Sequence, residues 1–418
     1  MQYKKYDCDT YNIYTIKTDK FKSCIISTFF RDNINDRKLI TDLAMLMKVM
    51  TQTNKSYSKH RDLIIRVEEL YGANFFASND RLGNSYGIEF GVEFINPFYV
   101  TEKNYLDEII DFNYDMIFNP NVTNDEFDLK SFNIEKEKML VSLERLHENP
   151  FKYAIKRAFK NMDSDSISSF YIEKENVEQV TPSSLYKTYK EIINNSICDI
   201  YVIGDMDMDE VVSKIKNKIN LKMIKNHDLD LYVHNKKSKK VRKFKEYDEY
   251  MQANLIYGFN IDELNQKEKI AIRLFNEIAC GGMNSKLYKK LRVENSLCYG
   301  LSPMYFKYDN LIFLHVSFDE VNYDKVVKLI NEGLKEMKSG KITDEEFDRA
   351  KKSLQFSVKL SNDSIDSILS NYVIHNLAGI PLLEEYENEI AKITIEDVAN
   401  VAKKITPNFI YLLGKEEK

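Results

Sequence analysis

The stretch that decides the fold of this chain lies at residues 281–300, which read Gly-Gly-Met-Asn-Ser-Lys-Leu-Tyr-Lys-Lys-Leu-Arg-Val-Glu-Asn-Ser-Leu-Cys-Tyr-Gly. An apolar run with helical spacing (270–279) precedes it, and the paired glycines Gly281 and Gly282 are a good helix stop. Ser285 is then expected to be the N-cap residue of a short second helix.

Arg292 and Tyr299 lie seven residues apart, across the end of that second helix and the start of an extended segment. This spacing can bring a guanidinium group and a phenol to one spot. The arginine offers several fixed donors and the tyrosine a neutral O–H, so together they can hold a peptide carbonyl and a developing oxyanion. The spacing alone favours the plainer interpretation, an exposed arginine and a half-buried tyrosine without a shared role.

Composition bounds the size and class of the protein. A chain of 418 residues suits two domains of about 200 residues each. Its 60 basic and 65 acidic residues give a net charge of −5, which is no global signature of nucleic-acid binding. The five cysteines are scattered, without a C-x-x-C pair, as expected of reduced thiols in a cytoplasmic protein.

Neither a secretory signal nor a membrane span is visible in the sequence. Residues 1–7 lead into no apolar region, and no apolar run approaches the roughly 18 residues that a bilayer requires. The sequence therefore predicts a soluble cytoplasmic protein without a membrane partner.

Several short segments recur in the same order, which predicts an internal duplication. Residues 123–128 (TNDEFD) return at 343–348 (TDEEFD), and both read Thr-x-x-Glu, the pattern of a helix capping box. Residues 200–204 (IYVIG) return at 410–414 (IYLLG), and Tyr71-Gly72 matches Tyr299-Gly300. We therefore expect two copies of one α+β unit, with domains at 1–218 and 248–418.

Periodicity and punctuation predict the elements of the first copy. Helical spacing marks 37–50, 105–118 and 123–160, with a break in the last at Asn149-Pro150. Thr181-Pro182 is expected to open another helix, with the proline at its first position.

The segment between the two copies, 219–247, is polar and rich in lysine. A nucleic-acid patch is conceivable here, but no aromatic ladder accompanies the lysines and acidic residues follow at 246, 248 and 249. A charged interdomain linker, without a nucleic-acid partner, is the preferred interpretation.

The pattern Gly-Gly-x-x-Ser-x-Leu-x-x-x-x-Arg-x-x-x-x-Leu-x-Tyr resembles the C-terminal half of the insulinase-like (pitrilysin) zinc peptidase family. The resemblance implies two duplicated α/β-roll domains, as in mitochondrial processing peptidase, each a mainly antiparallel sheet covered by helices. It implies that Arg292 and Tyr299 grip the substrate and act in catalysis. Gly281, Gly282 and Ser285 are implied as substrate-binding positions.

The zinc apparatus of that family is missing here. Active members carry His-x-x-Glu-His on the first long helix, where histidines at i and i+4 bind zinc and the glutamate acts as general base. Counting back from Asn74 places this motif at residues 44–48, where Ala44 and Lys48 replace the histidines and Met47 replaces the glutamate. The later glutamate ligand falls near Ser142. We therefore expect no zinc in this chain.

Two further sequence tests bear on chemistry. The six histidines contain no i, i+3 or i, i+4 pair, which argues against a metal site on one helix, and an improvised site from His60, His147 and Glu144 is the alternative left open. Neither Gly-x-x-x-x-Gly-Lys-Ser/Thr nor Gly-x-Ser-x-Gly occurs, which argues against a P-loop NTPase and a serine hydrolase.

The resemblance is strongest to the zinc-less subunits of Firmicute-type bacteria, in which two chains share the work of one peptidase. It implies that this chain supplies the arginine and tyrosine, and that a zinc-bearing partner subunit cleaves small peptides. The alternatives are an inert peptide-binding or structural scaffold of the same fold and a self-sufficient metallopeptidase. On the first hypothesis the chain is inactive alone and acts as a heterodimer.

Overall fold

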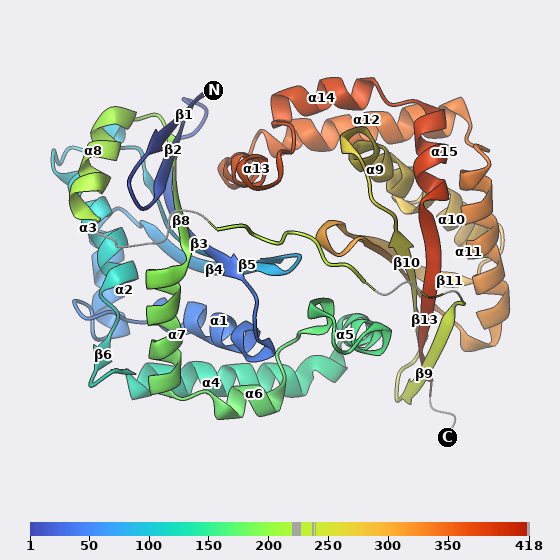
Figure 1. Cartoon of the computed structure of the whole chain (residues 1–418), viewed down its shortest axis with the longest axis horizontal. Coiled ribbons are helices and arrows are strands. Elements are labelled where there is room, and N and C mark those ends of the chain that lie inside the picture. Colours follow the sequence, from blue (N-terminus) through green and yellow to red (C-terminus); the bar gives the residue numbers. More distant parts are fainter. Residues whose placement is uncertain (220–226, 236–237, 239, 416–418) are drawn as a thin grey trace. The chain divides into compact units, whose positions relative to one another are not determined.

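Two β-sheets organise the chain, one in each of two units (Figure 1). The computed structural model describes residues 1–219, 227–235, 238 and 240–415. The first unit consists of Met1–Arg145 and Phe170–Leu231, and the second of Leu146–Ser169 and Tyr232–Lys418.

The first unit holds a sheet and the helices that cover it. Its strands are β1 (Gln2–Asp7), β2 (Asn12–Lys17), β3 (Ser23–Asn33), β4 (Asn74–Leu82), β5 (Ser85–Ile95), β6 (Val122–Thr123), β7 (Glu126–Phe127) and β8 (Ile197–Gly204). Its helices are α1 (Arg37–Met50), α2 (His60–Glu69), α3 (Tyr105–Phe118), α4 (Leu129–Glu144), α6 (Lys174–Gln179), α7 (Pro182–Asn195) and α8 (Met208–Lys218).

The second unit is built in the same manner. Its strands are β9 (Arg242–Asp248), β10 (Ala253–Ile261), β11 (Cys298–Phe306), β12 (Leu311–Phe318) and β13 (Ile405–Lys415). Its helices are α5 (Pro150–Met162), α9 (Gln266–Cys280), α10 (Lys286–Tyr288), α11 (Tyr323–Lys338), α12 (Asp344–Ser361), α13 (Ile365–Ala378), α14 (Leu383–Ala391) and α15 (Ile395–Lys403).

The two sheets share one strand order. The first runs β1-β2-β8-β3-β5-β4, and the second, read from its far edge, runs β9-β13-β10-β12-β11. In both, one pair is parallel (β2 with β8, β9 with β13) and every other pair is antiparallel. The duplicated, mainly antiparallel α+β architecture expected from the sequence is therefore confirmed, with β1 as an extra edge strand in the first unit.

The core of the first unit lies between its sheet and α3. Phe30 of β3 is fully buried and packs edge-on against Phe90 of β5 and Phe118 of α3. The bounds of α3 are those that periodicity predicted, because its apolar stripe meets the sheet along its whole length.

The core of the second unit uses both faces of the central strand β10, which is buried at every residue. Leu255, Tyr257 and Phe259 belong to the apolar cluster formed with α9, α11 and α15. Gly258 faces the other way, where an added Cβ would lie 2.1 Å from the Phe409 ring. Helix α5 covers that second face, where the ring of Phe159 lies 4.5 Å, centre to centre, from that of Phe313 and is tilted by 41°.

The division into units differs from the predicted boundary at residue 218, because α5 packs in the second unit although it comes from the first half of the chain. Asn149 caps α5 and Pro150 is its first residue, which confirms the predicted break. An ion pair fixes the helix against the sheet: Nε of Arg157 lies 2.8 Å from Oε2 of Glu246 on β9.

The predicted linker, 219–247, contains most of strand β9. Its residues 242, 244 and 246 are half-buried and alternate with exposed neighbours, because polar partners face them. Arg242 donates to the carbonyl of Met162 at 2.6 Å, and Glu246 receives Arg157. The predicted lysine cluster at 236, 237 and 239 lies outside the described residues.

One of the two predicted capping boxes is wrong. Thr343 caps α12 together with Glu346, as expected, and Thr181 likewise caps α7 with Ser184. Residues 122–127, however, form the hairpin β6–β7, whose turn residues Asn124 and Asp125 have φ values of 53° and 62°. These two residue types tolerate that left-handed conformation, so a turn forms here and α4 begins later, capped by Asp128.

Candidate functional site

The structure brings Arg292 and Tyr299 together in the second unit. The guanidinium carbon of Arg292 lies 5.8 Å from the centre of the Tyr299 ring, and its Nη1 donates to the carbonyl of Cys298 at 2.8 Å. Arg292 is exposed and Tyr299 is 60% exposed. Both side chains are therefore accessible to a ligand and lie side by side.

A π-helical turn, Lys289–Val293, places Arg292. The N–H of Glu294 bonds the carbonyl of Lys289, five residues back, at 2.9 Å, and Ser296 follows with a left-handed φ of 53°. Leu291 is fully buried and anchors the turn, so that its neighbour Arg292 points outward. Turns of this kind are uncommon and are often found at functional sites.

A β-bulge places Tyr299. In the pairing of β11 with β12, Cys298 lies opposite Phe318 and Gly300 opposite Ser317, which leaves Tyr299 as the extra residue. A bulge of this kind turns its extra side chain out of the regular alternation. The backbone is therefore irregular at both residues: Arg292 lies in a π-helical turn and Tyr299 in a β-bulge. The sequence spacing predicted neither feature.

The loop after α9 contains the two glycines and Ser285. Gly282 has a φ of 76°, and a Cβ on Gly281 would lie 2.7 Å from Cα of Glu277, so both positions favour glycine. Ser285 occupies the predicted N-cap position, yet its hydroxyl donates to the carbonyl of Gly282 at 2.8 Å. Ser285 is fully buried, so we revise its expected role from contact with substrate to stabilisation of this loop.

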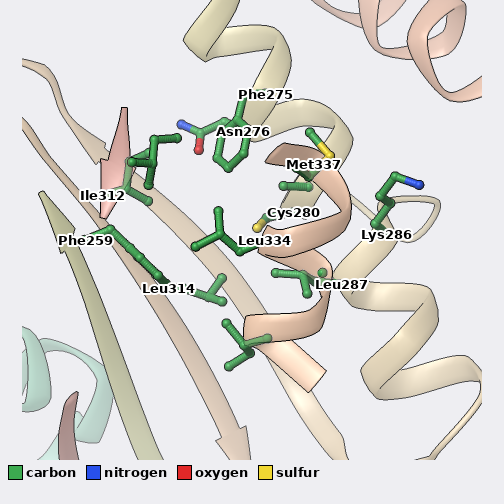
Figure 2. A pocket seen from close by; sticks show the side chains of 14 residues that line it. Phe259, Phe275, Asn276, Cys280, Lys286, Leu287, Ile312, Leu314, Leu334 and Met337 are labelled. Atoms are coloured by element: carbon green, nitrogen blue, oxygen red, sulfur yellow. The ribbon is translucent and has the colours of Figure 1, made fainter. Parts of the chain in front are cut away.

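A small apolar cavity of about 30 Å³ lies beneath this loop (Figure 2). Leu287 of α10 lines it and fits against Gly333 of α11, where an added Cβ would lie 2.5 Å from the leucine Cδ2. Lys286 forms a 2.8 Å ion pair with Glu346. These contacts anchor α10 and, through it, the π-helical turn that carries Arg292.

The positions that match the zinc motif lie on α1 and α4, which contact each other. Met47 is 5% exposed and Lys48 is exposed, while Ala44 is half-buried and Ser142 exposed. Alanine offers no donor atom and a protonated lysine repels a cation, so this set does not fit zinc.

The methionines of α1 are part of the core of the first unit. Met45, Met47 and Met50 are at most 5% exposed.

The alternative metal ligands are engaged elsewhere. Nδ1 of His60 lies 3.0 Å from the carbonyl of Gln52, that of His147 lies 3.2 Å from Asp248, and Glu144 pairs with Lys174 at 3.0 Å. Within the described part of the chain, no three His, Cys, Asp or Glu side chains are grouped so as to hold a metal ion. Nor does a helix of that part have the length and apolarity needed to cross a membrane.

Comparison with known proteins shows what this chain is similar to. Residues 179–354 match the family described as the peptidase M16 inactive domain. The "Probable inactive metalloprotease YmfF" of Bacillus subtilis (strain 168) is 24% identical over 412 residues, covering 96% of this chain and 95% of that protein. In these comparisons the chain is similar to the M16, or insulinase-like, peptidase family.

Solved structures of this M16 fold superpose on the whole chain. A conserved protein from Enterococcus faecalis V583 has a TM-score of 0.92 at 24% identity and covers 97% of both chains. A peptidase M16 inactive domain from Pseudomonas fluorescens has a TM-score of 0.80 at 15% identity and covers 100% of this chain and 98% of its own. Because the sequence identities are low, this structural similarity establishes the fold alone.

Proposed function

We propose that this chain is the non-zinc-binding subunit of a two-chain M16 peptidase that cleaves small peptides in the cytoplasm. It supplies Arg292 and Tyr299 to a zinc-bearing partner subunit and is inactive alone. The observation that carries the proposal is the exposed Arg292–Tyr299 pair, held by a π-helical turn on one side and a β-bulge on the other.

Geometry explains why the pair suits a peptide carbonyl. One Nη of Arg292 is used by the carbonyl of Cys298, which fixes the guanidinium plane and leaves further N–H groups directed to solvent. Tyr299 has an exposed ring and adds an O–H donor beside them. Donors held in place before reaction stabilise an oxyanion without the cost of reorganisation.

The chemistry divides between the two subunits. Zinc in the partner would activate the attacking water, because a bound zinc ion lowers the pKa of water to about 7. Arg292 and Tyr299 orient the substrate carbonyl and donate to its oxygen as negative charge develops there. Loss of one such donor typically costs about 3 kcal/mol in the barrier, or roughly 100-fold in kcat.

The test is cleavage of a fluorogenic peptide by this chain mixed with its zinc-bearing partner. We expect Arg292→Ala and Tyr299→Phe each to lower kcat by roughly 100-fold. Lys352→Ala and Tyr247→Phe are matched controls, since both side chains are exposed in the same unit, and they should leave the rate unchanged. Cleavage that survives both test variants would dismiss the proposed role.

The second candidate is an inert peptide-binding or structural protein. The similarity to a Bacillus subtilis protein named as a probable inactive metalloprotease favours it. A scaffold of this kind would bind peptide through the Arg292–Tyr299 pair without supporting cleavage by any zinc-bearing partner. Equal peptide affinity in the wild-type and Arg292→Ala proteins would argue against peptide binding through this pair.

A further inference from the structure

A second cavity, of about 260 Å³, lies in the second unit. It is formed by α9, by residues at the end of β11, and by the chain around the start of α14. Three basic side chains line it, Lys269 and Arg273 of α9 and Lys307, together with the phenols of Tyr305 and Tyr386. Lys269 and Arg273 are four residues apart, which places both on one face of the helix.

The three cations of this cavity have tyrosines, rather than carboxylates, as neighbours. Lys269 donates to the hydroxyl of Tyr232 at 3.2 Å, and Arg273 to that of Tyr386 at 3.0 Å. Lys307 lies 5.0 Å from the centre of the Tyr308 ring. Across the described residues, none of the three forms an ion pair.

Two half-buried lysines elsewhere in the same unit are neutralised by glutamates, unlike the cations of this cavity. Lys286 pairs with Glu346 at 2.8 Å and Lys290 with Glu336 at 2.7 Å. Burial, together with the positive charges of Lys269 and Arg273, lowers the pKa of Lys307 to about 8. Like charges are therefore gathered in one place at an energetic cost, and a bound anion would remove that cost.

We propose that this cavity binds the oxyanion group, a carboxylate or a phosphate, of a small ligand. The planar guanidinium of Arg273 suits two parallel hydrogen bonds to such a group, and the two lysines add point charges from either side. The tyrosine rings supply an apolar wall for the body of the ligand. The volume suits a small molecule or the end of a peptide.

This site is separate from the Arg292–Tyr299 pair. Tyr299 lies at the beginning of β11, and Lys307 directly follows its last residue, Phe306. A strand rises about 3.3 Å per residue, so the two sites are on the order of 20 Å apart along β11. Anion binding should consequently be independent of Arg292, and its failure would leave the proposed peptidase role untouched.

The test is calorimetric titration of the full chain at pH 7 and low salt. One arm uses inorganic phosphate, and the other a short peptide with a free C-terminal carboxylate beside its amidated form. We expect saturable binding in at least one arm, weakened at least tenfold by Arg273→Gln. The arm that binds identifies the source of the oxyanion.

Three controls keep the result interpretable. Lys307→Met retains side-chain length without charge and should weaken binding as Arg273→Gln does, with thermal unfolding of the free variants checking their folding. Lys352→Gln removes an exposed charge on α12, and Arg292→Ala one at the other site, and both should bind as the wild type does. Absence of binding in both arms, or equal weakening by Lys352→Gln, would overturn the proposal.

Discussion

The two units can be compared strand by strand, because β2-β8-β3-β5-β4 and β9-β13-β10-β12-β11 follow one order. Edge strand β4 of the first unit corresponds to edge strand β11 of the second. Pairing of β4 with β5 is regular from Asn74 to Leu82, whereas pairing of β11 with β12 shifts at Tyr299. A π-helical turn stands before β11, and an ordinary α-helix, α2, before β4.

The difference lies in where each unit departs from regular structure. Exposed Arg292 and Tyr299 accompany the irregular backbone of the second unit. In the first unit, the helix that matches the family's zinc motif is regular and carries buried methionines. Irregular backbone costs stability, so its presence beside the exposed Arg292–Tyr299 pair favours a function for that pair. Helix α1, by contrast, contributes to packing.

Placing a glutamate at the family's general-base position should have the largest effect. Met47→Glu buries a carboxyl group, and burial raises the pKa of such a group by about 3–5 units, each worth about 1.4 kcal/mol. We expect the free energy of unfolding at pH 7 to fall by about 4 kcal/mol or more, as measured in urea.

The pH dependence of that variant follows from the sign of the shift. A raised pKa penalises the charged form in the folded state, so the loss grows as pH rises above about 4.3 and shrinks below it. Lys48→Glu, at an exposed neighbour, should change stability by less than about 0.5 kcal/mol. A Met47→Glu protein as stable as the wild type would show that α1 is not a packing helix.

Truncating the anchor of α10 should have the next largest effect. Leu287 is 5% exposed and borders a cavity, so Leu287→Ala enlarges a void. We expect a loss of about 3 kcal/mol in urea unfolding, within the 2–5 kcal/mol typical of buried leucine. Leu360→Ala, at an exposed leucine of α12, is the matched control. Similar losses in the two variants would contradict the assigned anchoring.

Acidification should lower the folding stability of the second sheet through His315. Burial lowers the pKa of His315 on β12 to about 4. A histidine whose folded pKa is depressed loses stability as pH falls from about 6.5 towards 4, because only the unfolded chain takes up the proton.

For His315 this loss should reach about 2 kcal/mol between pH 7.5 and pH 5. Urea unfolding at the two pH values measures it. His315→Gln should remove that part of the pH dependence while leaving the remainder. An unchanged slope in the variant would mean that His315 does not titrate in this way.

Removing the exposed phenol should have the smallest effect on folding. Tyr299 is 60% exposed and lies outside the strand ladder, so Tyr299→Phe should change the free energy of unfolding by less than about 0.5 kcal/mol. A loss above about 2 kcal/mol would assign Tyr299 to the scaffold and weaken the comparison between the units.

Local signals in the sequence predicted local structure well. Thr181-Pro182, Asn149-Pro150 and the Thr343 capping box mark helix starts where the structure has them, because caps depend on neighbouring residues alone. Thr123 carries the same pattern but precedes Asn124-Asp125, where a left-handed turn competes with the helix. The sequence pattern alone does not show which of the two structures, the helix start or the turn, is more stable.

The sequence could not reveal contacts made over long distances. Strand β9 reads as a polar linker, because the partner that makes Glu246 half-buried, Arg157, lies far away in sequence. The spacing of Arg292 and Tyr299 suggested that they meet, but the bulge and the π-helical turn depend on the pairing of β11 with β12. The cavity of Lys269, Arg273 and Lys307 likewise exists only once β11 lies beside α9.

The most direct test of a shared peptidase is to measure zinc content and peptide cleavage on the same three samples: this chain, its zinc-bearing partner, and their mixture. The account predicts zinc in the partner and in the mixture, and cleavage in the mixture alone. One zinc per molecule in this chain, together with cleavage by this chain alone, would contradict it.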